Sequence, residues 1–275
     1  MLIARRSRLA LRGWYFFTMS EYPFCEFCGL NDSPPDKEEL VAKWIAREFP
    51  DAKWSITKFS TGRQFTTQNH FGLTTRKVCR RCNNRWMSDL ESKAKQVLAP
   101  MIHGNELLLD PNDQLTIAKW AMKSTIVYEI HDDREEYFFN RDEWHRLFAS
   151  GSMPLNDTAI YLAYSDDPTP GQVRLTETRR NGLPAADERG QFAEIEIYCT
   201  TFAIKHFAMQ VITLHRAKTF TEPLTFNIPP EWQDASLCIW PVAADVTWPP
   251  RLVLNDGGFN HFAKRWGSPD VYMYS

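Results

Sequence analysis

Apolar residues in the first hundred positions recur at two spacings, one typical of helices and one typical of strands. In 36–49 they lie three and four positions apart after two prolines, which predicts a helix. Residues 53–59 alternate between polar and apolar and precede Gly62, so they predict a strand that enters a hairpin. The helical spacing returns after Cys82 and stops near Pro100. A hairpin and a helix are therefore expected in succession.

The rest of the chain predicts a mixture of helices and strands. Residues 115–130 have the spacing of a mostly buried helix, with Lys119 and Lys123 expected on an exposed face. Two polar segments containing Gly and Pro, 165–172 and 180–191, are expected as surface loops. Alternating and β-branched runs predict strands, the last two joined as a hairpin, at 158–164, 173–178, 193–202 and 207–214.

Two Cys-x-x-Cys pairs are the strongest chemical signal in the sequence. Six cysteines in 275 residues are few for a disulfide scaffold, and a chain with 43% apolar residues can bury a core without bridges. Cys199 and Cys238 lie outside any ligand spacing and are expected to be buried thiols. The paired thiols match a closed structural zinc site and favour Zn²⁺ over disulfides at Cys25, Cys28, Cys79 and Cys82.

Positive charge gathers around the second pair, although the formal net charge of the chain is only -2. A basic run of this kind can be a solvated surface. Beside a metal knuckle it favours contact with phosphates, because local charge sets the field that a nucleic-acid backbone meets. We therefore predict a nucleic-acid partner, with DNA preferred, for the five basic residues Arg76, Lys77, Arg80, Arg81 and Arg85.

The N-terminus only weakly matches a signal peptide, because Arg12 interrupts the would-be apolar core. Translation that starts at Met19, or a basic arm without fixed structure, is the preferred interpretation. No run of eighteen apolar residues occurs, so no membrane span is predicted and the cytoplasm is the expected location. The expected organisation is an α+β protein with a basic extension, a zinc-knuckle domain and a mixed α/β domain at 1–18, 19–105 and 106–275.

Three polar residues near the cysteine pairs are candidates for chemistry, because a zinc ion held by four thiolates has no open position for substrate. Glu38 and Glu39 lie in the first turn of the predicted helix 36–49, and Asn83 follows the second pair. Their oxygens suit Mg²⁺ or Mn²⁺. The alternative, which the sequence alone favours, is that the two glutamates only complement the helix dipole.

These motifs resemble a bacterial branch of the HNH endonucleases, with weaker similarity at 119–123, 200–202, 239–241 and 248–250. The resemblance implies a zinc-clamped ββα-metal unit, treble-clef-like, in which one divalent ion assists cleavage of a phosphodiester. It implies that Glu38 binds this metal and that Asn83 supplies a further polar group. The matching stretches are Cys25-x-x-Cys28-Gly29, Lys37-Glu38-x-x-x-x-Lys43-Trp44 and Val78-Cys79-x-x-Cys82-Asn83-Asn84-x-Trp86-Met87-Ser88-x-Leu90-Glu91.

Glu39 stands where the family has a histidine that activates water. A glutamate near a cation is a weaker base at pH 7 than a neutral imidazole. Glu39 can act as a poor base or extra ligand, His70 can supply the imidazole instead of being a solvent-facing loop residue, or the site can bind without cleaving. The expected function is that of an HNH-like, metal-dependent nuclease, and the alternative is a non-catalytic zinc-stabilised module that binds nucleic acid or protein.

Overall fold

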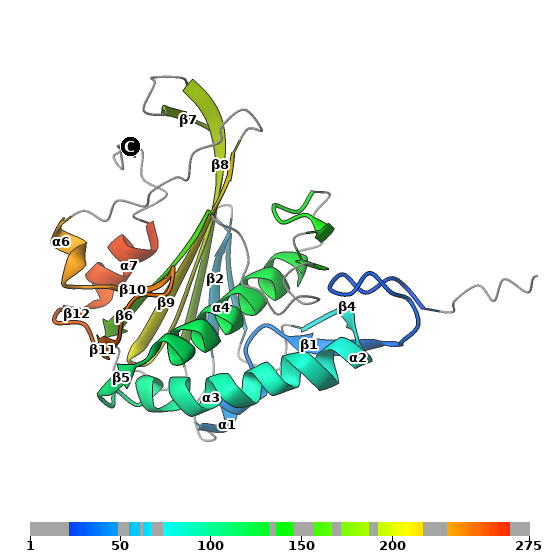
Figure 1. Cartoon of the computed structure of the whole chain (residues 1–275), viewed down its shortest axis with the longest axis horizontal. Helices are drawn as coiled ribbons and strands as arrows, with labels where there is room; N and C mark the ends of the chain where they lie inside the picture. Colours follow the sequence, from blue (N-terminus) through cyan, green and yellow to red (C-terminus); the bar gives the residue numbers. More distant parts are fainter. Residues whose placement is uncertain are drawn as a thin grey trace, which may run out of the picture.

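The computed structural model describes residues 22–48, 55–60, 63–67, 74–131, 136–142, 144–145, 157–166, 172–186, 192–216 and 230–264. An eight-stranded sheet dominates this part of the chain, and two long helices cross one of its faces (Figure 1). The sheet is antiparallel except where β2 pairs with β7 and β12 pairs with β6. Its strand order is β10 (Leu237–Trp240), β6 (Thr158–Ser165), β9 (Phe207–Arg216), β8 (Phe192–Ile204), β7 (Gln172–Ala186), β2 (Ser55–Ser60) and β3 (Arg63–Thr67), with β12 (Val253–Leu254) beside β6.

The strands predicted from alternation are confirmed as β6, β7, β8 and β9, including the hairpin that joins the last two. β7 is longer than expected. It continues to Ala186 and pairs with β8 beyond a register shift after Arg180, so the loop predicted at 180–191 is wrong over 180–186. Backbone pairing with β8 continues along this extension as far as Ala186.

Helix α4 (Pro111–His131) confirms the helix predicted at 115–130. Asp110 caps its start, since its Oδ1 accepts the main-chain N–H groups of Asn112 and Asp113 at 2.7 and 2.8 Å. One face of α4 packs on the sheet, where the hydroxyls of Thr125 and Thr200 lie 2.9 Å apart. The opposite face is covered by α3, so the exposure predicted for Lys123 is wrong: the residue is only 2% exposed.

The helix predicted at 36–49 is wrong over its first half. Residues 35–39 form strand β1 (Pro35–Glu39), which pairs antiparallel with β4 (Thr74–Cys79), and only the short helix α1 (Lys43–Glu48) remains helical. Pairing with a strand distant in the sequence outweighs the local helical spacing. Glu38 and Glu39 therefore lie on a strand and do not complement a helix dipole.

The predicted hairpin is confirmed as β2 and β3, but it pairs with β7 of the large sheet. The strands that adjoin the cysteines are instead β1 and β4. After β4 the chain forms one nearly continuous helical rod, made of α2 (Arg80–Cys82), a π-helical turn η1 (Asn83–Met87) and α3 (Ser88–Ile102). This confirms the helix predicted after Cys82, which runs two residues past Pro100.

The cysteine-bearing segment and the large sheet share one buried core. Phe27 and Val78 beside the cysteines belong to the same apolar cluster as Trp120 on α4 and Ile160 on β6. Among the remaining described elements, β5 (Leu107–Leu109) pairs with β11 (Val246–Trp248), the short helix α6 (Pro230–Gln233) precedes β10, and α7 (Asp256–Lys264) follows β12. In the part of the chain described, no helix has the length and apolar character needed to cross a membrane.

Candidate functional site

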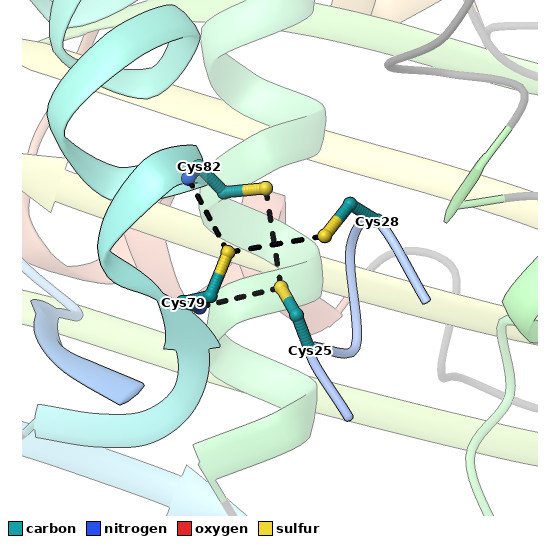
Figure 2. Close-up of side chains that lie close together, drawn as sticks. All are labelled: Cys25, Cys28, Cys79 and Cys82. Carbon is teal, nitrogen blue, oxygen red and sulfur yellow. Dashed lines mark hydrogen bonds between the residues drawn. The ribbon is translucent and has the colours of Figure 1, made fainter. Parts of the chain in front are cut away.

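The four cysteines of the two pairs converge on one point (Figure 2). Cys25 and Cys28 lie in the loop before β1, Cys79 ends β4, and Cys82 lies in α2. Their sulfurs all lie within 4.8 Å of one another, with Cys25–Cys82 at 3.9 Å and Cys28–Cys79 at 3.8 Å. Tetrahedral Zn–S bonds of about 2.3 Å place neighbouring sulfurs about 3.8 Å apart. The tetrad therefore fits a closed zinc site.

The first knuckle depends on Gly29. Its φ of +66° is in the left-handed region, and its N–H donates to the carbonyl oxygen of Cys25 at 2.9 Å. A Cβ atom at this position would lie 2.4 Å from Cε1 of His145. Only glycine both adopts this turn and leaves room for the imidazole.

Several N–H groups of the chain point at the sulfurs of the tetrad. The main-chain N–H of Cys79 donates to Cys25 Sγ at 3.3 Å, and that of Cys82 donates to Cys79 Sγ at 3.5 Å. The guanidinium of Arg81 lies 3.9 Å from Cys28 Sγ. The hydrogen bond with the Cys82 thiol lowers the pKa of the Cys25 thiol, whereas burial raises the pKa of Cys79 and the hydrogen bond to Cys25 raises that of Cys82. A thiolate is the form that binds zinc, so among these three thiols the chain by itself favours the ionised form only at Cys25.

A cleft of about 760 Å³ lies between β1, α1 and the rod formed by η1 and α3. Glu38, Glu39 and Asn83, the three candidates for chemistry, all line it, the two glutamates from β1 and the asparagine from η1. His70, the fourth candidate, lies outside the described residues. The cleft is lined by Pro35, Asp36, Lys37, Glu38, Glu39, Ala42, Lys43, Trp44, Arg47, Arg76, Arg80, Asn83, Asn84, Met87, Ser88, Glu91, Ser92 and Lys95.

The structure brings only two of the five basic residues singled out above, Arg76 and Arg80, into this cleft. Lys77 points to the other face of β4, where its ammonium donates to the hydroxyl of Tyr137 at 2.6 Å. Arg81 pairs with Asp32 at 2.8 Å, and Arg85 is exposed outside the cleft. Alternation along β4 separates the side chains of Arg76 and Lys77, so a contiguous basic run in the sequence does not form one surface.

Other cations replace them in the cleft. Lys37 on β1 and Arg47 on α1 line it together with Arg76 and Arg80, and none of these four has an ion-pair partner among the described residues. The other two cationic side chains in the lining are neutralised. Lys43 pairs with Glu39 at 2.8 Å, and Lys95 pairs with Glu48 at 2.9 Å. Carboxylates of Asp36, Glu38, Glu39 and Glu91 also line the cleft, so its six cations exceed its four anions by two and leave a net positive lining.

Lys123 lies behind the cleft wall and joins two of its carboxylates. Its Nζ donates to Glu38 Oε1 at 2.8 Å and to Glu91 Oε1 at 2.5 Å. Glu91 also accepts the indole N–H of Trp44 on Oε2 at 2.6 Å and that of Trp120 on Oε1 at 3.0 Å. β1, α1, α3 and α4 thus meet in a single polar network next to the cleft.

The ammonium of Lys123 stays charged in this network. Burial by itself would lower its pKa, but the negative charges of Glu38 and Glu91 and the hydrogen bonds to them outweigh burial and raise the pKa. These carboxylate oxygens are therefore a poor fit to Mg²⁺ or Mn²⁺, because a resident cation already occupies the place between them. A divalent ion near Glu39 and Asn83 would have to be held without Glu91.

Sequence reasoning missed Glu91 and Lys123 as members of the site. Lys123 carried a usable signal, because most of its helical neighbours, including Trp120, Ile126 and Val127, are apolar, and a lone lysine in such surroundings implies a buried partner. Glu91 carried little signal beyond its place in the resemblance. Function is therefore inferred from the cleft itself, since no family model, no curated protein and no solved structure matches this chain.

Proposed function

We propose that the chain binds a nucleic-acid backbone, with DNA as the first candidate, in the cleft between β1, α1 and α3. The observation that carries this proposal is the convergence of four cations without ion-pair partners among the described residues, each from a different element. They are Lys37 of β1, Arg47 of α1, Arg76 of β4 and Arg80 of α2. A concave surface with this charge attracts a chain of phosphates and gains affinity by releasing its counterions.

The proposed binding is directed at the backbone and not at the bases. Trp44, the aromatic residue in the lining, is only 8% exposed, and its indole N–H is committed to Glu91. It therefore offers little surface on which a base can stack. Contacts from lysine and arginine to phosphates position nucleic acid without reading its sequence. We infer that a zinc ion at the cysteine tetrad holds β4 and α2, and with them Arg76 and Arg80, in place.

The test is a salt titration of binding measured by fluorescence anisotropy, using labelled duplex DNA, single-stranded DNA and RNA. The variant Arg76→Gln/Arg80→Gln should bind duplex DNA more weakly. The slope of log K against log salt should also fall by about 0.9 for each phosphate that the variant no longer neutralises. Arg85→Gln is the matched control, because Arg85 is exposed nearby but outside the cleft. Equal weakening in the control and the double variant would contradict the proposal.

A second candidate is hydrolysis by an HNH-like nuclease. The observation that favours it is the convergence of Glu38, Glu39 and Asn83 on the cleft beside a tetrad that fits zinc. A strong base is missing from the described lining, which contains no histidine. The assay incubates supercoiled plasmid with the protein and Mg²⁺ or Mn²⁺. Cleavage that Glu38→Ala abolishes would support hydrolysis, whereas binding without cleavage would leave only the first proposal.

The variant Glu39→His tests whether the site lacks only its base. Glu39 forms an ion pair with Lys43, and neither residue belongs to the Lys123 network. Replacement by histidine should therefore leave the buried charges in place. Cleavage that appears with this variant, and not with the isosteric control Glu39→Gln, would identify position 39 as the defect. No gain in activity would count against hydrolysis as the present function.

A further inference from the structure

The carboxylates of Glu38 and Glu91 share one ammonium, although β1 and α3 supply them from opposite sides of the cleft. Lys123 Nζ lies 2.8 Å from one and 2.5 Å from the other, and the lysine side chain is 2% exposed. α4 delivers this ammonium from behind, because Lys123 itself does not line the cleft while both glutamates do. The cation is therefore part of the buried wall and not a surface ion pair.

Glu91 has little capacity left for a metal, because three of its about four lone-pair positions already accept hydrogen bonds. Its Oε1 accepts hydrogen bonds from Lys123 and Trp120, and its Oε2 accepts one from Trp44. An octahedral Mg²⁺ or Mn²⁺ ion requires about six oxygen ligands at about 2.1 Å, and Glu91 can supply Oε1 only by breaking its bonds to Lys123 and Trp120. The indole N–H groups of Trp44 and Trp120 hold the Glu91 carboxylate in the orientation in which it accepts the hydrogen bond from Lys123.

We propose that Lys123 is the resident cation of the cleft, occupying the position between Glu38 and Glu91 that a divalent ion would otherwise take, so that the cleft binds phosphate without Mg²⁺ or Mn²⁺. The phosphate part of this proposal rests on the proposed nucleic-acid binding. The exclusion of a divalent ion from the position between Glu38 and Glu91 does not, because it follows from the contacts of Lys123.

Basic side chains near the Lys123 network also disfavour a divalent cation in the cleft. Lys37, Arg76 and Arg80 line the same cleft and repel an incoming divalent cation, while they attract an anion. Lys123 remains protonated, since the two carboxylates raise its pKa despite its burial. A site that carries its own fixed cation has nothing to gain from a second one held by the same oxygens.

The decisive experiment is a titration of the zinc-loaded full chain with Mn²⁺, in which electron paramagnetic resonance counts the free ion. Mn²⁺ prefers oxygen ligands and leaves the thiolates to zinc. The wild-type chain should bind no Mn²⁺ that depends on Glu38. Lys123→Ala, which vacates the position and leaves both carboxylates, should gain one Mn²⁺ with an affinity at least about tenfold above wild type.

Two controls make the gain specific. Lys119→Ala removes a half-buried lysine one helical turn away on α4 and should gain no Mn²⁺. Lys123→Ala/Glu38→Gln removes one of the two carboxylates and should lose the gained ion. A Lys123→Ala chain that folds but gains no Mn²⁺ would overturn the proposal.

The wild-type chain also tests the proposal if Lys123→Ala does not fold. One equivalent of Mn²⁺ bound by wild type and lost in Glu38→Gln would overturn it, and its absence would support it. DNA binding is measured separately in metal-free buffer and with added Mg²⁺, and affinity should not rise with Mg²⁺. A chain that binds no DNA but gains Mn²⁺ in Lys123→Ala would refute nucleic-acid binding and leave the assignment of Lys123 intact.

Discussion

Asn83 donates its side-chain amide to the main-chain carbonyl oxygen of Lys37 at 3.0 Å. The bond joins the first residue of η1 to β1, so it connects the two walls of the cleft. η1 is a π-helical turn, a form that is often found at functional sites. Asn83 is therefore best described as a positioning residue, since it holds the strand that carries Glu38 and Glu39 against the helical rod.

Asn83→Ala should loosen β1 without disturbing the tetrad. Loss of one partly exposed hydrogen bond should lower the free energy of unfolding by about 0.5–1.5 kcal/mol, as measured by urea denaturation. DNA affinity should fall severalfold while zinc content stays unchanged. Asn84→Ala, which removes an exposed neighbour that also lines the cleft, is the control. An equal effect of both variants would argue against a positioning role.

Zinc removal should unfold the part of the chain around the tetrad. We expect one zinc per chain by elemental analysis, and a large fall in melting temperature after chelation, because the metal supplies much of the local folding free energy. Cys82→Ser should behave like the chelated protein. Cys199→Ser and Cys238→Ser should retain zinc, and loss of zinc from either would show that the tetrad is not the site.

Gly29→Ala should weaken the first knuckle through both strain and collision. The left-handed φ of Gly29 and the 2.4 Å approach to His145 each oppose a Cβ atom, so we expect destabilisation of about 1–3 kcal/mol. The double variant Gly29→Ala/His145→Ala removes the collision but keeps the strain. It should recover part of the loss relative to His145→Ala alone, and a double-mutant cycle measures that share.

Lys123→Met should be among the most destabilising single changes in the described part of the chain. It leaves two carboxylates without their ammonium, and breaking a buried ion pair in this way costs about 3–5 kcal/mol. Lys119→Met on the same helix should cost far less, because Lys119 is half-buried and has no ion pair among the described residues. Urea denaturation midpoints of the two variants compare these losses of stability, and similar midpoints would refute the role given to Lys123.

The stabilisation from Lys123 should be constant across neutral pH. Its pKa is raised in the folded state, so the contribution is fully present below the unfolded-state pKa of about 10.4 and is lost only as pH rises through the folded value. The difference in unfolding free energy between wild type and Lys123→Met should therefore not shrink between about pH 6 and about pH 9. A difference that shrinks between these values would show a neutral lysine.

The sequence predicted those features that depend on local spacing. Alternation identified β6, β8 and β9, helical periodicity identified α4, and the spacing of the four cysteines identified a site that the fold does assemble. These signals are local because each element shows its own burial pattern, and because thiols at knuckle spacing have few alternative uses.

The features that local spacing could not predict depend on partners distant in the sequence. Local spacing predicts a helix for the residues of β1, and only the neighbouring strand β4 makes them a strand. Local spacing likewise predicts an exposed Lys123, and only the packing of α3 on that face of α4 buries it. The basic run at 76–85 predicts one charged surface, but Arg76 and Lys77 point to opposite faces of β4. In each case tertiary packing determined the environment of residues whose own pattern was ambiguous.

The parallel pairing of β2 with β7 means that the chain leaves the cysteine site after α1, contributes two strands to the large sheet, and returns as β4. The two structural parts are thus interwoven. Excising the cysteine-bearing segment would separate β2 from its partner β7, and Glu38 and Glu91 from the lysine that they share. The unit that carries the cysteine tetrad therefore depends on the large sheet and on α4 for its completion.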